Sequence, residues 1–88
     1  MGKNDVVTVV AVSGEYVGRF VSNNGGAVTL KDPRMLVHNE QGMGFANGIA
    51  VTGKKDPTIV TFHSYVFATT TNEEVEKSYI QAVSGLVL

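Results

Sequence analysis

The sequence contains no cysteine, so its 88 residues offer no disulfide framework, no thiolate metal site and no cysteine nucleophile. An excess of either charge is also missing. The formal net charge is −1 and the pI is about 6.0, whereas a nucleic-acid-binding domain usually has a strongly basic surface. Any binding of nucleic acid must therefore come from a local patch.

Long hydrophobic runs are missing as well. The apolar stretch from Val6 to Val12 covers about seven residues and includes Thr8, so it is too short for a secretory signal peptide or a membrane span. We therefore expect a cytoplasmic protein that is not inserted in a membrane.

β-Branched residues, by contrast, are abundant: the chain has 15 Val, 8 Thr and 3 Ile, which fit a pleated, half-buried surface better than a helix. Hydrophobic residues make up 43% of the chain, enough to form a core, and 88 residues are too few for two cores. We predict a single, mainly β domain over residues 1–88.

Three local patterns define the expected strands. The nearly unbroken apolar run Val6–Val12 is typical of a strand covered on both faces. Gly18 inside the next alternating segment indicates a sharp bend, and residues 23–26, Asn-Asn-Gly-Gly, indicate a hairpin turn. Together with the remaining apolar segments, these patterns predict strands at about 5–12, 15–22, 26–38, 45–52, 57–62 and 65–70.

The C-terminal segment has a different pattern. Thr71 and Glu74 have the spacing of a capping box, apolar residues then recur at helical spacing, and Gly85 is placed to end the helix. We predict one amphipathic helix over about 72–84. The expected fold is a small, strongly bent antiparallel barrel of five to six strands with this C-terminal helix.

Residues with catalytic or ligating chemistry are sparse. The glycines of 42–48 do not have dinucleotide-loop spacing, and no nucleophile elbow is present. His38 and His63 are 25 residues apart and lack partners at zinc-type spacing. We expect no enzyme activity, no metal and no cofactor. Tyr65 and Phe67 alternate on one expected strand, where they either stack on bases or fill the core.

The hairpin resembles the first motif of the Sm and Sm-like family, which includes a bacterial RNA-chaperone branch. The resemblance consists of the apolar strand Val9–Val12, then Gly14, and then residues 18–31, whose spacing matches the motif without a gap. Residues 62–66, Phe-His-Ser-Tyr-Val, are similar to the basic residue and histidine that the bacterial branch has between its last two strands.

This resemblance implies that the bent barrel is Sm-like or SH3-like. It further implies a cyclic homo-oligomer in which neighbouring barrels pair their edge strands. It also implies binding of single-stranded RNA or DNA at the turn after the second strand and at the His63 turn. Identical loops converge in such a ring, so scattered cations can form one basic patch. The residues expected to contact nucleic acid are Asn23, Asn24, Gly25, Lys31, Arg34, Lys54, Lys55, His63 and Ser64.

Several positions depart from the family motif. Asn24 replaces the loop aspartate, Gly26 stands where a base-stacking side chain is frequent, and Val28 replaces a base-contacting asparagine. The glycine turn is one residue short, and the usual N-terminal helix is missing, with the C-terminal helix as its substitute. These departures leave an alternative open, namely an oligomeric structural or interaction module that has lost nucleic-acid binding.

Overall fold

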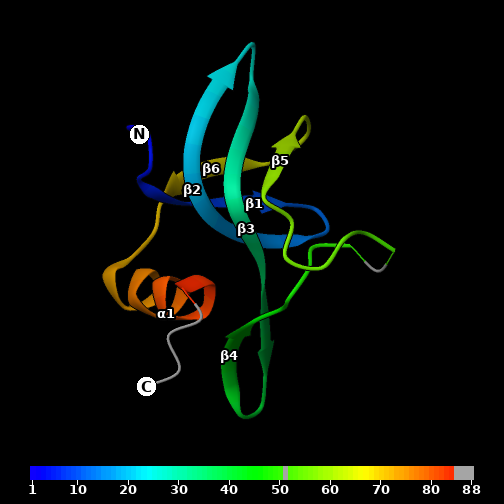
Figure 1. Ribbon diagram of the computed structural model, residues 1–88, viewed down its shortest axis with the longest axis vertical. Helices are drawn as coiled ribbons and strands as arrows, with labels where there is room; N and C mark the ends of the chain where they lie inside the picture. Colours follow the sequence, from blue (N-terminus) through cyan, green and yellow to red (C-terminus); the bar gives the residue numbers. More distant parts are fainter. Residues whose placement is uncertain (51, 85–88) are drawn as a thin grey trace.

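A computed structural model describes residues 1–50 and 52–84, which form six β-strands and one α-helix (Figure 1). The strands are β1 (Val6–Ala11), β2 (Gly14–Asn24), β3 (Ala27–Asn39), β4 (Gly42–Phe45), β5 (Ile59–Phe62) and β6 (Phe67–Thr70), and helix α1 spans Glu73–Ser84. The strand pairs of this described part are antiparallel. The prediction of a small, mainly β domain with a C-terminal helix is confirmed.

The strands form one strongly bent sheet in the order β4-β3-β2-β1-β6, with β5 also paired to β3. The first half of β3 lies between β2 and β5, whereas its second half pairs with β4. In Figure 1 the β2 and β3 ribbons curve across β1, and the β3–β4 hairpin projects downward beside α1. Within the described residues β5 and β6 do not pair with each other, so the barrel is open.

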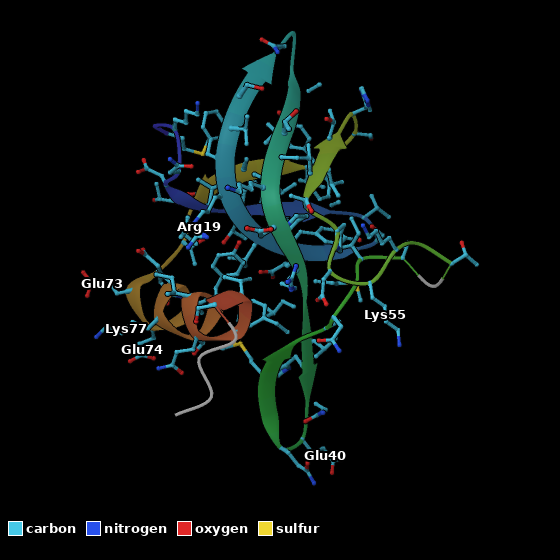
Figure 2. All side chains as sticks on the ribbon, viewed as in Figure 1. Arg19, Glu40, Lys55, Glu73, Glu74 and Lys77 are labelled. Atoms are coloured by element: carbon cyan, nitrogen blue, oxygen red, sulfur yellow. The ribbon has the colours of Figure 1, made fainter. Side chains whose placement is uncertain are left out.

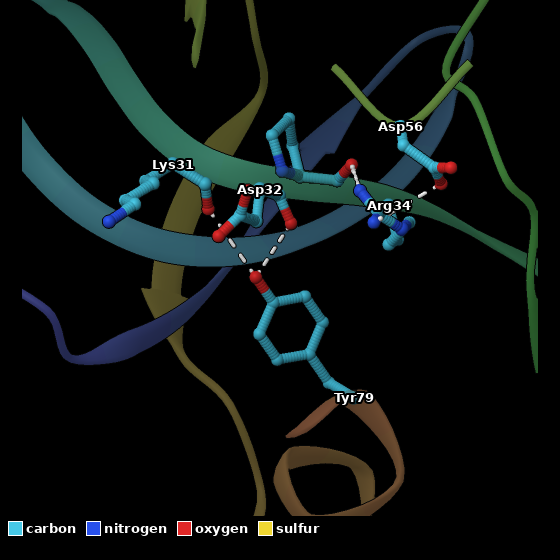
Figure 3. Close-up of polar contacts among 6 residues, drawn as sticks. Lys31, Asp32, Arg34, Asp56 and Tyr79 are labelled. Carbon is cyan, nitrogen blue, oxygen red and sulfur yellow. Dashed lines mark hydrogen bonds and ion pairs between the residues drawn. The ribbon is translucent and has the colours of Figure 1, made fainter. Parts of the chain in front are cut away.

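The bend in β3 is centred on Asp32. This residue has a φ of 50°, in the left-handed region that residues other than glycine rarely adopt, and Pro33 follows it. The Asp32 amide donates to the Thr58 carbonyl at 2.7 Å, and the Tyr79 hydroxyl of α1 donates to the Asp32 carbonyl at 2.6 Å (Figure 3). A loop and the helix therefore hold the bend from two sides.

Gly18 lies where β2 packs closely against β3. A Cβ atom at this position would lie 3.1 Å from side-chain atoms of Leu30 and 3.2 Å from the Lys31 carbonyl oxygen. The register with β3 also shifts between Val17 and Arg19, as expected at a bulge. A side chain here would require Leu30 or the β3 backbone to shift, so Gly18 allows the close approach at the bend that the sequence predicts.

Two apolar clusters lie on opposite faces of the sheet. The cluster inside the bend contains Val7, Val9, Val28 and Leu30, with Phe20, Phe62, Tyr65 and Ala68 packed against it. The second cluster lies under α1 and contains Val6, Val17 and Tyr79, with Phe45, Val75 and Val83 around it. Successive residues of a strand point to opposite faces, so the apolar run of β1 supplies both clusters.

The helix begins differently from the prediction. Asn72, not Thr71, is the N-cap, because its Oδ1 accepts a hydrogen bond from the Val75 amide at 2.9 Å. The Thr71 hydroxyl instead shares a hydrogen bond of 2.8 Å with the Thr8 hydroxyl of β1. The predicted capping box is therefore wrong, and the predicted stop at Gly85 lies outside the described residues.

Two strand predictions need correction. The strand expected at 45–52 is instead β4, which ends at Phe45, and residues 46–50 form a loop that returns toward β5; Val51 lies outside the described residues. The strand expected at 65–70 begins only at Phe67. In both places apolar residues line a loop or turn, which an apolar pattern alone does not distinguish from a strand. No helix in the described residues is long and apolar enough to cross a membrane.

Candidate nucleic-acid interface

The turn between β2 and β3 has the conformation expected from its sequence. Gly25 and Gly26 have φ values of 59° and 89°, which are those of a type I′ turn. The Asn23 Oδ1 accepts a hydrogen bond from the Gly26 amide at 3.2 Å, so this side chain stabilises the turn. Asn23 and Asn24 are both exposed, and the side-chain amide of Asn24 takes no part in this hydrogen bond.

The β5–β6 turn lies beside the start of β3. β3 and β5 are antiparallel, and Val28 pairs with Phe62, the last residue of β5. His63 and Ser64 follow directly and are exposed, so they come next to the base of the β2–β3 turn. Figure 1 shows both turns at the same end of the sheet. The structure thus brings together five of the predicted residues: Asn23, Asn24, Gly25, His63 and Ser64.

The four predicted cations lie elsewhere. Lys31 pairs with Ile59 at the opposite end of the β3–β5 ladder from the two turns. Lys54 and Lys55 are exposed on the loop between β4 and β5, and Figure 2 shows Lys55 on this loop, on the side of the molecule opposite α1. In one chain, these lysines do not form a patch with the turns.

Arg34 is a correction to the predicted set, because it is only 8% exposed. It lies opposite Val17, on the face that α1 covers. Its Nη1 donates to the Pro33 carbonyl at 3.0 Å, and its Nη2 lies 3.3 Å from Oδ1 of Asp56 (Figure 3). The Arg34 guanidinium is therefore bound within the chain and is not presented to a nucleic acid.

Tyr65 and Phe67 have separate roles. Tyr65 is half-buried and packs against the cluster inside the bend, which is the core alternative of the prediction. Phe67 is 50% exposed at the start of β6, and the preceding Val66 is 64% exposed. These two residues and Ile59 of β5, which is 54% exposed, are exposed apolar side chains on or next to the last two strands. The sequence reasoning considered Phe67 only as a stacking or core residue and did not single out Val66 or Ile59. The sequence did contain a signal for this apolar surface, because neither β5 nor β6 contains a charged residue.

Tyr79 is the other residue whose role was missed. Its side chain is fully buried, its hydroxyl donates to the bend of β3, and the Arg19 guanidinium carbon lies 5.9 Å from the centre of its ring. Burial raises the pKa of Tyr79 from 10.0 to about 12, against the opposing effect of the arginine charges. The neutral phenol is thus the form that the fold requires.

This pKa predicts an alkaline loss of stability. The unfolded chain ionises Tyr79 near pH 10 and the folded protein only near pH 12, so the contribution is complete below pH 10 and is lost as the pH rises toward 12. We expect a loss of about 2–3 kcal/mol in the free energy of unfolding over this interval. Urea unfolding of the protein and of the Tyr79→Phe variant between pH 10 and pH 12 measures this loss. An equal loss in both proteins would assign the transition to other groups.

Chemically, the arrangement offers amide, imidazole and hydroxyl groups on two adjacent turns. The described residues contain no cluster of three His, Asp or Glu side chains that could hold a metal ion. The amide, imidazole and hydroxyl groups of the turns can form hydrogen bonds with a ligand. Comparison of the chain with models of protein families, with curated proteins and with solved structures finds no match.

Proposed function

We propose that the chain forms an Sm-like homo-oligomeric ring that binds single-stranded nucleic acid, in the first place RNA, without catalysing a reaction. The observation that carries the proposal is the pairing of Val28 with Phe62, which places the β2–β3 turn beside the β5–β6 turn. Two polar turns at one end of a small bent sheet form a contact surface that a ring repeats around its axis.

Assembly is supported by the unprotected edges of the open barrel. Within the described residues β5 pairs only with β3, and β6 only with β1, so each leaves one edge of backbone donors and acceptors unpaired. Soluble proteins usually protect such edges with lysine or proline, but β5 (Ile-Val-Thr-Phe) and β6 (Phe-Ala-Thr-Thr) have neither. Pairing of β5 with β6 of a neighbouring copy satisfies both edges and covers Ile59 and Phe67.

Binding in this proposal is passive. The Asn24 amide, the His63 imidazole and the Ser64 hydroxyl can donate to and accept from base edges, and no covalent bond forms or breaks. A single chain offers few such contacts. Repetition around a ring multiplies them along one strand of nucleic acid, which raises the overall affinity without a strongly basic protomer.

A second candidate function is an oligomeric structural or interaction module without nucleic-acid binding. The observation that favours it is the position of the cations: Arg34 is paired with Asp56, and Lys54 and Lys55 lie on a different loop from the turns. Phosphate contacts from lysine and arginine usually supply much of the affinity for nucleic acid. The two candidates share the assembly and differ only in whether the turns bind.

The test is a fluorescence anisotropy titration of the assembled protein with short uridine-rich and adenine-rich RNA and the corresponding DNA, at about 50 and about 200 mM salt. We expect binding at the lower salt concentration, and about tenfold weaker binding by the double variant Asn24→Ala/His63→Ala. The matched control is Lys54→Ala/Lys55→Ala, which removes charge away from the turns and is expected to weaken binding by less than about threefold. An assembled protein that binds none of the oligonucleotides at low salt would favour the second candidate.

A further inference from the structure

A groove of about 210 Å³ lies between the β3–β4 hairpin and α1. It is separate from the two polar turns, which lie at the other end of β3 (Figure 1). Its lining comes from both strands of the hairpin and from the first half of the helix: Leu36, Met43, Gly44, Phe45, Glu74, Val75 and Ser78.

The backbone of β4 is free along this groove. β4 is the last strand of the sheet order, so within residues 1–50 and 52–84 only one of its edges is paired. The Ala46 amide donates to the Met35 carbonyl at 2.9 Å, and by the alternation of an antiparallel ladder the backbone groups of Gly44 also point toward β3. The N–H and C=O groups of Met43 and Phe45 therefore point to the open edge, where another strand can pair with them.

The side chains beside this edge form an apolar surface, and contact with the helix holds part of it in place. Phe45 packs edge-on against Tyr79, with ring centres 5.9 Å apart and planes at 75°, so its position is held by the helix. Leu36 and Val75 are half-buried next to it. Met43 is 60% exposed although it lies on the helix-facing side of the hairpin, opposite His38. An apolar side chain inserted from outside would cover Met43 and rest on Phe45.

The rim of the groove carries one acidic side chain. Glu74 lines it, whereas Glu73 and Glu76 lie on another face of the same helix beside Lys77. Figure 2 shows Glu73 and Glu74 on the helix and Glu40 at the tip of the hairpin, with Lys77 as the neighbouring cation on α1. Among the residues that the structure describes, no lysine or arginine lines the groove. Its charge is therefore complementary to a basic ligand.

We propose that this groove binds an extended segment of a partner protein in which apolar residues alternate with lysine or arginine. The segment pairs with β4 as an additional strand, through the free backbone groups of Met43 and Phe45. Alternation then directs its apolar side chains into the groove and leaves its basic side chains near Glu74 and Glu40. This binding uses the edge of β4, so it does not depend on the assembly through β5 and β6 or on nucleic-acid binding.

The test titrates the isotopically labelled protein with a synthetic peptide that alternates lysine with leucine or valine, followed by NMR. We expect chemical-shift changes in residues 42–45 and 74–78. A peptide with glutamate in place of each lysine is expected to bind at least about tenfold more weakly, as is the lysine peptide to the Met43→Lys variant. The matched control Val12→Lys replaces an apolar residue that is 99% exposed outside the groove, and it should bind like the unchanged protein.

Three results would overturn the proposal. The first is equal binding of the lysine and glutamate peptides, which would show that the charged rim selects nothing. The second is a set of shift changes outside the groove, or the same loss of binding in Val12→Lys and Met43→Lys. The third is a concentration-dependent shift of residues 42–45 without peptide, since a second copy of the chain would then occupy the groove. Circular dichroism of each variant verifies that it is folded.

Discussion

Replacement of Tyr79 by alanine is expected to remove about 3–5 kcal/mol from the free energy of unfolding, as for other large buried aromatic residues. Tyr79 is fully buried and is the centre of the cluster under α1. Its hydroxyl also donates to the Asp32 carbonyl at 2.6 Å, so the substitution leaves the bend of β3 without its helical partner. A domain of this size has a total stability of roughly 5–15 kcal/mol, so the loss is a substantial fraction of the total.

Urea unfolding monitored by circular dichroism measures this effect, and two further variants separate its causes. Tyr79→Phe keeps the ring and removes the hydroxyl, which leaves a buried carbonyl without its donor and should cost about 1–3 kcal/mol. Ile80→Ala is the control on the same helix, because Ile80 is 38% exposed and should cost less. A Tyr79→Ala variant as stable as Ile80→Ala would show that α1 does not hold the sheet.

Replacement of Phe67 by lysine is expected to convert the proposed ring into a monomer of 9.4 kDa. Phe67 is 50% exposed on β6, and a lysine at an unpaired edge opposes pairing with a second strand because its charge must stay hydrated. Ile59→Lys changes the other proposed edge and is expected to have the same effect. Light scattering after size-exclusion chromatography gives the mass of each variant.

Met43→Lys is the control for this experiment. Met43 is 60% exposed on β4, so the variant places the same charge on an exposed apolar position outside the two proposed edges. Its mass should equal that of the unchanged assembly. A loss of assembly in Met43→Lys with none in Phe67→Lys or Ile59→Lys would assign the contact between copies to β4 and contradict the proposed ring.

The sequence predicted the first half of the fold well because its local signals agree with the tertiary structure. The continuous apolar run of β1 requires cover on both faces, and the two clusters provide it. Gly25 and Gly26 permit the type I′ turn, and Gly18 permits the close approach to Leu30. Each of these features follows from the conformational range of one or two residues, so a single sequence is enough to reveal it.

The second half was predicted less accurately because several residues act through distant partners. Asn72 takes the cap, whereas Thr71 bonds to Thr8, which is 63 positions earlier in the chain. Arg34 is buried on the face of the sheet that α1 covers, and its guanidinium pairs with Asp56 in the loop between β4 and β5. An apolar pattern also does not reveal that residues 46–50 leave the sheet. Such outcomes depend on tertiary contacts that local propensity does not encode.

The candidate site divides in the same way. The turn residues could be predicted, since Asn24 lies in a recognisable hairpin and His63 follows an apolar strand. Their proximity rests on the β3–β5 register, and the separation of the cations from them rests on the path of the loop between β4 and β5. Neither the proximity of the two turns nor the separation of the cations from them can be predicted without knowing the strand topology. The structure therefore supports the two turns as a contact surface more strongly than it supports a basic patch.

The central claim, an assembled ring that binds single-stranded RNA, is tested most directly by one light-scattering measurement. The protein is mixed with a labelled uridine-rich RNA at low salt and separated by size-exclusion chromatography. The account predicts that the RNA co-elutes with a species whose protein mass is a fixed multiple of 9.4 kDa. A protein that elutes at 9.4 kDa, with the RNA in a separate peak, would contradict it.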